Sequence, residues 1–176
     1  MRYRINLLAS LLMVCSALLV TACKSKPSNT QQPLKTLVTP DSVDIKVVAV
    51  IDGDTIDISL DGSKTRVRLA NIDAPEKAQK YGTQAKQKLA DLLLNKSIYL
   101  QKLGKDKYGR TLGTDTVNGL NINKEMVKSG YAWAYMTGDV YYNQLQLQAQ
   151  REKLGLWADS NPIPPNEWRK HNGEGF

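Results

Sequence analysis

The sequence predicts an α+β domain that is mainly β: a five-stranded Greek-key barrel of the OB type with about three helices. Three observations favour this fold. Three strand patterns follow one another between Asp-Gly turns, a helical pattern comes next, and two further strands precede the last helical segments. A barrel of this kind offers one face and its loops to oligonucleotides, although a fold does not by itself establish a function.

The first three strands are expected over residues 45–51, 56–60 and 65–69. The first is a β-branched run, and the other two alternate apolar and polar residues as half-buried strands do. The dipeptides Asp52-Gly53 and Asp61-Gly62 separate the strands and favour hairpin turns. These features predict a three-stranded meander.

A helix and two further strands are expected next. Apolar residues recur at helical spacing over 83–95, and strands are expected over 98–100 and 110–117, joined by a charged turn over 104–109.

Two more helical segments are expected near the C-terminus. One ends at Gly130 and the other covers about 141–154. The tail after Asn161 is rich in proline, so we expect it to be non-helical and to lie along the surface.

The first 22 residues have the features of an export signal. Arg2 and Arg4 provide a positive start, and the apolar stretch 7–20 is short for a membrane span. The segment ends in Val20-Thr21-Ala22-Cys23, which resembles a bacterial lipobox. We therefore expect Cys23 to be lipidated as the first residue of the mature chain; an uncleaved anchor and ordinary signal cleavage are the alternatives.

The rest of the chain divides into a tether, a domain and a tail. Residues 23–43 are polar and proline-containing, which predicts a flexible tether; residues 44–160 form the domain and 161–176 the tail. Cys15 is lost with the signal and Cys23 carries lipid, so no disulfide is expected. This organisation predicts an exported, membrane-anchored lipoprotein on the periplasmic side of the envelope or at the cell surface.

The chain carries a formal net charge of +7, from 24 Lys and Arg against 17 Asp and Glu. Such an excess favours a polyanionic partner, either nucleic acid or an anionic membrane surface. A merely soluble basic protein is equally compatible with this charge.

Carboxylates cluster around one basic strand between residues 52 and 76. Asp54 follows the first turn, Arg68 lies on the third strand, and Asp73 and Glu76 lie in the loop that leaves it. Clustered carboxylates suit a hard cation, and a rigid guanidinium beside them suits phosphoryl chemistry. Both acidic segments are also ordinary turn sequences, and Arg68 alone could be a solvated strand residue. Strand alternation does not by itself bring Arg68 to the carboxylates.

A second basic element is the segment Lys105-Asp106-Lys107-Tyr108-Gly109-Arg110. A basic turn with a tyrosine suits a phosphate backbone and a stacked base. An exposed hairpin loop without function is the alternative.

In order and spacing, the motifs resemble the thermonuclease (staphylococcal nuclease-like) family over about residues 45–170. Each motif is weak alone. They are Asp52-Gly53-Asp54-Thr55, Val67-Arg68-Leu69, Ile72-Asp73-Ala74-Pro75-Glu76, Tyr81-Gly82, Asp106-Lys107-Tyr108-Gly109-Arg110, Gly130-Tyr131-Ala132-Trp133 and Gly155-Leu156-Trp157.

The resemblance implies roles for the acidic segment. Asp54 and Asp73 match the family's Ca²⁺ carboxylates, and the carbonyl of Ala74 matches a backbone ligand of the ion. Glu76 matches the glutamate held to activate or orient the attacking water. Asp52 is left with turn chemistry.

The resemblance also implies roles for the basic residues. Arg68 and Arg110 match the arginines that grip the scissile phosphate, and Lys107 and Tyr108 match residues lining the nucleotide pocket. The implied reaction is Ca²⁺-dependent hydrolysis of the 5′ P–O bond of DNA or RNA, single-stranded or locally unpaired, leaving 3′-phosphate ends. A monomer is expected.

Several positions depart from the family pattern. Asp115 stands where an aliphatic strand residue is usual, Gly113 where alanine is common, and Gln146 where the last helix usually carries a glutamate. A buried unpaired aspartate either costs several kcal/mol or shifts its pKa. Tyr135 and Tyr141 could not be matched to stacking residues.

Two other functions compete with a nuclease. One is a tethered binding module that holds nucleic acid without cutting it, and the other is an envelope lipoprotein whose basic face meets anionic lipid. The simultaneous presence of Asp54, Arg68, Asp73, Glu76 and Arg110 favours the enzyme.

Overall fold

The computed structural model describes residues 45–60, 62–135 and 139–172. Contacts divide the chain into two units, Met1–Leu37 and Val38–Phe176, and every described residue belongs to the second. The predicted signal segment, the predicted lipidation site Cys23, the predicted tether and Asp61 of the second turn lie outside the described residues.

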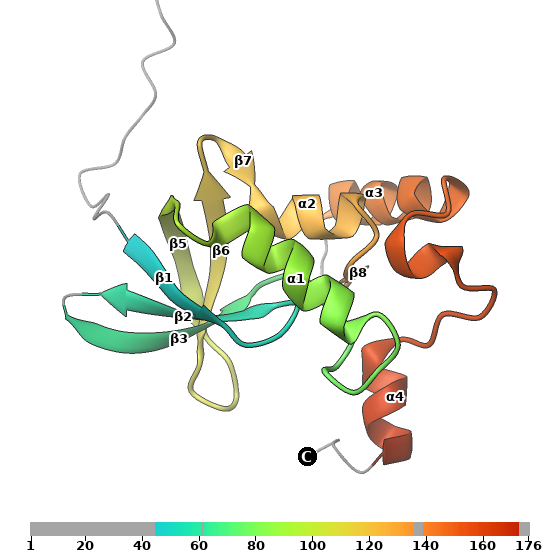
Figure 1. Cartoon of the computed structure of the whole chain (residues 1–176), viewed down its shortest axis with the longest axis horizontal. Helices are drawn as coiled ribbons and strands as arrows, with labels where there is room; N and C mark the ends of the chain where they lie inside the picture. The colour runs from blue at the N-terminus through green and yellow to red at the C-terminus, as the bar shows by residue number, and fades with distance from the viewer. Residues whose placement is uncertain (1–44, 61, 136–138, 173–176) are drawn as a thin grey trace, which may run out of the picture. The chain divides into compact units, whose positions relative to one another are not determined.

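Five strands close into a barrel (Figure 1). They are β1 (Ile45–Val50), β2 (Thr55–Leu60), β3 (Ser63–Leu69), β5 (Ser97–Lys105) and β6 (Thr111–Val117). The first three form the predicted antiparallel meander, β1 pairs with β5, and β5 with β6. Parallel pairing of β3 with β6 closes the barrel and sets Arg68 opposite Leu112. The predicted mainly β, α+β barrel is therefore confirmed.

Three short strands lie outside the barrel. They are β4 (Ile72–Asp73), β7 (Leu120–Asn121) and β8 (Trp133–Ala134). Strand β7 forms a hairpin with β6, and β4 pairs with β8, which fixes the residues that leave β3. Strand β5 is longer than expected, because it continues to Lys105 into the segment predicted as a turn.

Four α-helices and one 3₁₀ helix are found among the described residues. They are α1 (Gly82–Leu93), α2 (Ile122–Lys128), α3 (Val140–Arg151), η1 (Gly155–Ala158) and α4 (Pro165–Asn172). The prediction of a non-helical tail is wrong. Pro165 is the first residue of α4, where the missing N–H has no intrahelical acceptor and the fixed φ suits a helix.

The hydrophobic core joins the barrel to the helices α1, α2 and α3. Side chains that are almost wholly inaccessible to solvent come from several elements, including Ile56, Ile58, Val67, Leu69, Leu89, Leu93, Ile122 and Met126. A smaller cluster contains Leu156 and Trp157, and the Trp157 ring meets Trp133 edge-on with centroids 4.3 Å apart. In the part of the chain that the structure describes, no helix is long and apolar enough to cross a membrane.

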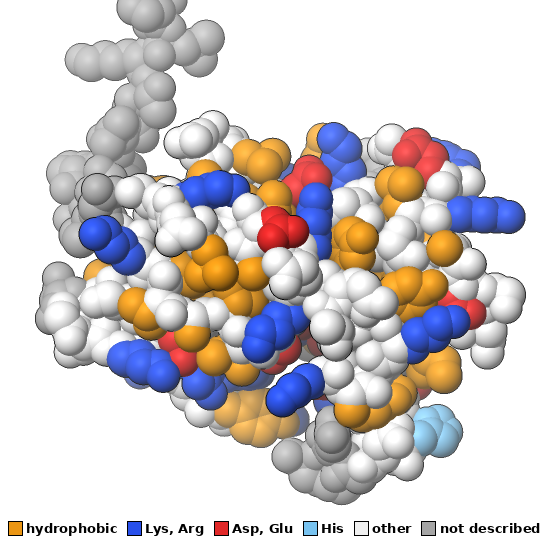
Figure 2. Space-filling view, in the orientation of Figure 1, with side chains coloured by type: hydrophobic (Ala, Val, Ile, Leu, Met, Phe, Trp, Pro, Cys, Tyr) orange, Lys and Arg blue, Asp and Glu red, His pale blue; other side chains and the backbone are white. Residues whose placement is uncertain are grey.

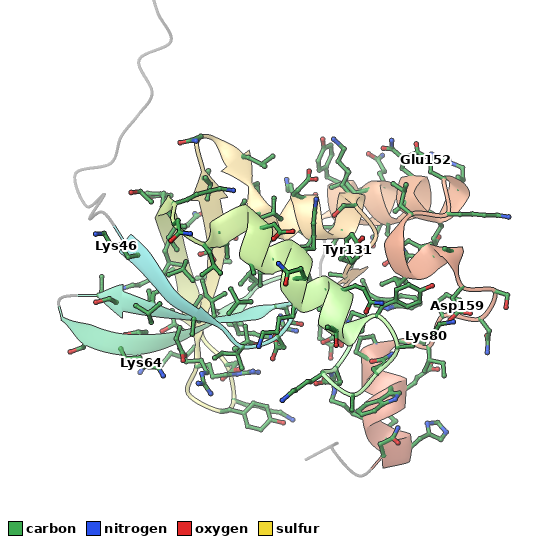
Figure 3. The ribbon with its side chains drawn as sticks, viewed as in Figure 1. Lys46, Lys64, Lys80, Tyr131, Glu152 and Asp159 are labelled. Carbon is green, nitrogen blue, oxygen red and sulfur yellow. The ribbon has the colours of Figure 1, made fainter. Side chains whose placement is uncertain are left out.

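The surface charge is dispersed on the face seen in Figure 2, where Lys and Arg side chains stand among apolar and uncharged ones. Some of these cations tie loops together. Lys80 and Asp159 lie side by side in Figure 3, and their 2.7 Å ion pair joins the start of α1 to the segment after η1. This contact helps to bring the C-terminal segment towards the loop that carries Glu76.

Asp115 of β6 is a buried carboxylic acid. It is 0 % exposed, and neither side-chain oxygen has a hydrogen-bond partner among the described residues. Its backbone N–H is satisfied, because it donates to Asn123 Oδ1 at 3.1 Å. Burial raises the pKa of Asp115 from 3.8 to about 7. This is the pKa shift expected for a buried aspartate that stands where the family usually has an aliphatic residue.

We expect Asp115→Val to stabilise the protein more at pH 8 than at pH 4. In the unfolded chain the Asp115 carboxyl has a pKa of 3.8, whereas in the folded chain its pKa is about 7, so it keeps its proton to near neutral pH. The free energy of unfolding of the wild type therefore falls as the pH rises from about 4 to 7. The fall is ~1.4 kcal/mol per pH unit, or up to about 4 kcal/mol in all. Urea unfolding of both proteins at the two pH values measures the difference. A gain from the valine that does not change with pH would contradict this account of Asp115.

Candidate active site

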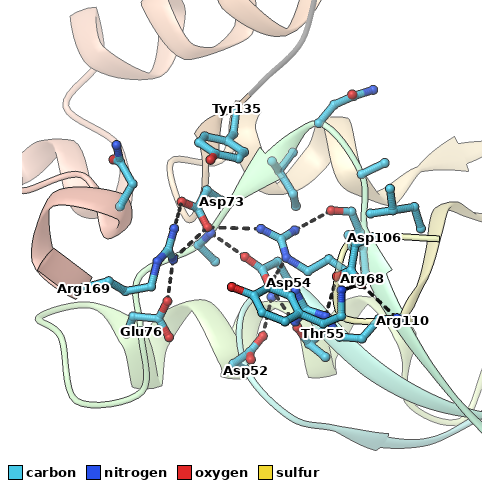
Figure 4. A pocket seen from close by; sticks show the side chains of 18 of the residues that line it. Asp52, Asp54, Thr55, Arg68, Asp73, Glu76, Asp106, Arg110, Tyr135 and Arg169 are labelled. Atoms are coloured by element: carbon cyan, nitrogen blue, oxygen red, sulfur yellow. Dashed lines mark hydrogen bonds and ion pairs between the residues drawn. The ribbon is translucent and has the colours of Figure 1, made fainter. Parts of the chain in front are cut away.

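A pocket opens where the turn after β1, the end of β3 and the loop between β5 and β6 meet (Figure 4). The segment 70–76 forms its floor, and α4 contributes Asn166, Arg169 and Lys170 to its wall. Every predicted site residue within the described part of the chain lines this pocket: Asp54, Arg68, Asp73, Ala74, Glu76, Lys107, Tyr108 and Arg110.

Asp54 is held rigidly by its neighbours. Asp52 Oδ1 accepts the Asp54 N–H at 3.0 Å, Asp54 Oδ1 accepts the Thr55 hydroxyl at 3.0 Å, and Asp54 Oδ2 accepts the Ala74 N–H at 2.7 Å. Burial, together with the charge of Asp54, raises the pKa of Asp52 to about 6. Asp52 therefore organises the turn, as expected, and Asp54 projects into the pocket.

Gly53 is required for space. A Cβ at this position would lie 2.6 Å from the Cβ of Ala74 and 2.7 Å from that of Ala85, closer than carbon atoms approach. The turn therefore packs directly against α1 and against the segment that carries Asp73. This close packing brings Asp54 and Asp73 together across the chain.

Arg68 lies between the two aspartates. Its Nε is 3.1 Å from Asp54 Oδ1 and its Nη2 is 3.1 Å from Asp73 Oδ1, while Nη1 donates to the Leu69 carbonyl. Its side chain is only 12 % exposed, which excludes a solvated strand arginine. Asp73 is 2 % exposed, and this burial raises the pKa of its carboxyl in spite of the arginines beside it.

Glu76 lies in a loop whose backbone is held by Gln79 and packs closely against Gly82. Its N–H donates to Gln79 Oε1 at 3.1 Å, its carbonyl accepts the Gln79 N–H at 2.9 Å, and a Cβ at Gly82 would collide with that carbonyl. The side chain is half-buried and points to the edge of the pocket, where Arg169 meets it.

Arg169 of α4 is the site residue that sequence analysis missed. Its Nη1 is 2.6 Å from Glu76 Oε1 and 3.2 Å from Asp73 Oδ1, and its Nη2 is 2.9 Å from Asp73 Oδ2 (Figure 4). These contacts span more than ninety positions of the sequence. Pro165 as a helix start, followed by basic residues in a last turn, could have signalled α4, but no local pattern places Arg169 at Asp73.

The loop between β5 and β6 presents the predicted phosphate- and base-binding residues. Asp106 Oδ1 accepts the backbone N–H groups of Tyr108 and Arg110 at 2.9 Å, and Asp106 Oδ2 pairs with Arg110 Nε at 2.7 Å. The Tyr108 ring is 58 % exposed, with Lys107 Nζ 4.9 Å and Arg110 Cζ 5.5 Å from its centre. The β3–β6 pairing places this loop beside Arg68, so both predicted arginines face one pocket.

Comparison with known protein families places the chain. Residues 66–159, more than half of the chain, match the family described as "Staphylococcal nuclease homologue". The chain belongs to this family. The predicted thermonuclease resemblance is thus confirmed, and with it the enzyme class, a phosphodiesterase-type nuclease.

Relatives in the staphylococcal nuclease family support the assignment over most of the chain. An "Uncharacterized endonuclease" of Haemophilus influenzae is 44% identical over 93% of this chain and 84% of its own length. A "Micrococcal nuclease" of Shigella flexneri is 40% identical over 71% of this chain and 79% of its own. The "Staphylococcal-like nuclease CAN1" of Arabidopsis thaliana is 36% identical over 64% of this chain but only 35% of its own.

The donor set of this staphylococcal nuclease family member fits a hard divalent cation. Asp54, Asp73 and the backbone carbonyl of Ala74 are oxygen donors of the kind that Ca²⁺ and Mg²⁺ take. Among the described residues, no group of three or more His, Cys, Asp or Glu side chains is arranged to hold a metal ion. The guanidinium groups of Arg68 and Arg169 lie against Asp54 and Asp73.

Gln146 and the two unmatched tyrosines have identifiable positions in the structure. Gln146 Oε1 accepts the Ala134 N–H at 2.8 Å, so the amide anchors β8. Tyr135 lines the pocket, whereas Tyr141 is 52 % exposed on α3 with Lys124 Nζ 4.6 Å from its ring centre. Tyr135 is therefore the tyrosine of this pair that belongs to the site.

Proposed function

We propose that this chain is a Ca²⁺-dependent, sugar-nonspecific nuclease that hydrolyses DNA and RNA, leaving 3′-phosphate and 5′-hydroxyl ends. The observation that carries the proposal is the position of Arg68 between two buried aspartates, in a pocket shared with Glu76 and Arg110. Membership of the staphylococcal nuclease family supports the nuclease class.

Arg68 and Arg110 are proposed to bind the scissile phosphate from two sides of the pocket. Hydrolysis gathers negative charge on the equatorial phosphate oxygens, and a fixed guanidinium stabilises that charge more than it stabilises the substrate. Ion pairs fix both guanidinium groups in position: Asp54 and Asp73 bind Arg68, and Asp106 binds Arg110. Because these pairs exist before substrate binds, little reorganisation is needed during the reaction.

Glu76 is proposed to take the proton of the attacking water, or to orient that water. A carboxylate in a fixed loop at the edge of the pocket suits this role. Asp54, Asp73 and the Ala74 carbonyl would hold the metal ion, and the bound ion would contribute further stabilisation of charge on the phosphate.

Tyr108 and Lys107 are proposed to select the form of the substrate. An exposed ring beside cations stacks on any unpaired base and contacts the backbone, which favours single-stranded or locally unpaired nucleic acid with weak sequence selectivity. Every proposed site residue comes from one chain, so a monomer is sufficient.

The proposal is tested by incubating the full chain with labelled single- and double-stranded DNA and RNA in Ca²⁺, in Mg²⁺ or with a chelator. We expect cleavage of all substrates in Ca²⁺, fastest on single strands, and fragments whose 3′ ends accept ligation only after phosphatase treatment. Binding without cleavage under every condition would instead support the nucleic-acid-binding module.

We also propose that Cys23 is lipidated and anchors the enzyme to the membrane of the cell that exports it. The apolar stretch followed by Val20-Thr21-Ala22-Cys23 supports this proposal. Cys23→Ser is expected to move the protein from the membrane fraction to the soluble exported fraction while the cleavage rate is unchanged. If the serine variant stays with the membrane as a processed chain that has lost residues 1–22, Cys23 is not the anchor.

A further inference from the structure

Arg169 binds the same carboxylates that the proposed function assigns to the metal ion and the attacking water. Its guanidinium contacts both oxygens of Asp73, at 3.2 and 2.9 Å, and Glu76 Oε1 at 2.6 Å. Asp73 is buried and the Arg169 side chain is 25 % exposed, so these pairs are largely shielded from water. The contacts are specific, because the planar fork of Arg169 matches the Asp73 carboxylate with two nitrogens.

These contacts leave little of Asp73 for a metal ion. Its Oδ1 accepts from both Arg68 and Arg169, and its Oδ2 accepts from Arg169. A Ca²⁺ ion needs its ligand oxygens at about 2.3–2.6 Å, and a guanidinium held at the same oxygens repels it. The ion and Arg169 therefore cannot both hold Asp73 in the observed geometry.

Of the two arginines, Arg169 is the one whose element can give way. Arg68 lies on β3, which is hydrogen-bonded to a neighbouring strand on each side. Helix α4, by contrast, is only eight residues long, and Pro165 is the one residue of this helix that is buried. The chain before α4 is tied by a hydrogen bond from Gln79 Nε2 to the Ile163 carbonyl at 2.7 Å. A helix of this length is marginal without tertiary contacts, and the Arg169 pairs are among the contacts that hold α4 at the site.

We propose that Arg169 stands in for the divalent cation in the metal-free enzyme and is displaced when the ion binds. This inference rests on the proposed function, in which Asp54 and Asp73 hold Ca²⁺. Arg169 then lowers the affinity for the ion, and by reciprocity the ion loosens the attachment of α4. A purely supporting role, in which Arg169 holds Asp73 and Glu76 ready for the ion, predicts the opposite sign: removal of the arginine would weaken metal binding.

Calorimetric titration of the full chain with CaCl₂ distinguishes the two roles. Arg169→Gln is expected to bind Ca²⁺ on the order of tenfold more tightly than wild type, since the competing charge-assisted hydrogen bonds are gone. Lys170→Gln is the matched control. This variant removes the same charge from the same helix, at a residue that also lines the pocket, but the ion pairs to Asp73 and Glu76 belong to Arg169. The Ca²⁺ affinity of Lys170→Gln is expected to stay within about twofold of wild type, because an exposed charge that does not contact the metal ligands is screened by water and salt.

Equal or weaker Ca²⁺ binding by Arg169→Gln, with wild type still binding, would overturn the inference and leave the proposed function intact. Failure of all three proteins to bind Ca²⁺ would overturn both. Hydrogen exchange of the wild-type chain supplies a readout that needs no variant: the amides of residues 166–172 are expected to exchange faster in saturating Ca²⁺ than in chelator. Unchanged or slower exchange there would also overturn the inference.

Discussion

Replacing Glu76 with glutamine is expected to lower the cleavage rate by about 10²–10⁴-fold while binding of single-stranded DNA persists. Glutamine keeps the size of the side chain and its hydrogen bond from Arg169, but it cannot accept a proton from water. The loop should keep its shape, because it is fixed by the backbone of Glu76 and by Gln79 and Gly82. Cleavage kinetics and a binding isotherm on the same oligonucleotide measure the two effects separately.

Glu152→Gln is the matched control for this variant. Glu152 is exposed just after α3, where its carboxylate accepts from Gln148 at 2.9 Å, and it does not line the pocket. The control should cleave at the wild-type rate. A wild-type rate in Glu76→Gln would remove Glu76 from the mechanism.

Replacing Arg68 or Arg110 with lysine is expected to lower kcat by roughly 10²–10³-fold, because an ammonium cannot copy the planar fork that grips a phosphate. The two variants should differ in stability. Arg68→Lys disturbs pairs to two buried aspartates, so its unfolding temperature should fall. Among the described residues Arg110 forms an ion pair with Asp106 alone, within its own largely exposed loop, so Arg110→Lys should unfold close to wild type.

Single-turnover cleavage and thermal unfolding of both variants measure these effects, with Arg151→Lys as the matched control. Arg151 ends α3 on the surface and does not line the pocket. Full activity in Arg110→Lys would show that this arginine does not touch the transition state.

The barrel could be predicted because its signals are local. Ile56 and Ile58 alternate with polar residues, and the following turn and strand repeat the pattern, so β2 and β3 are fixed by the sequence within them. The closure by β3 and β6 is not local. It depends on parallel pairing of Val67 with Thr111, for which no turn or spacing gives a signal.

Most members of the candidate site could be predicted from the sequence, but Arg169 and the geometry of the site could not. Strand alternation alone does not bring Arg68 to Asp54; the two meet because the β2–β3 register sets Thr55 opposite Arg68 and the Leu69 N–H donates to the Asp54 carbonyl at 2.8 Å. Resemblance to the family pattern marks Asp115 as unusual for its strand, and burial of its side chain raises its pKa. Arg169 could not be found, because proline was interpreted as a helix breaker when Pro165 in fact begins one.

The Ca²⁺ dependence of cleavage by the wild-type full chain tests the central claim most directly. A labelled single-stranded DNA is incubated with the enzyme in chelator, and then with CaCl₂ added in excess. The account predicts no cleavage in chelator, rapid cleavage after addition, and products that end in 3′-phosphate. Cleavage that continues unchanged in chelator, or none at any Ca²⁺ concentration, would contradict it.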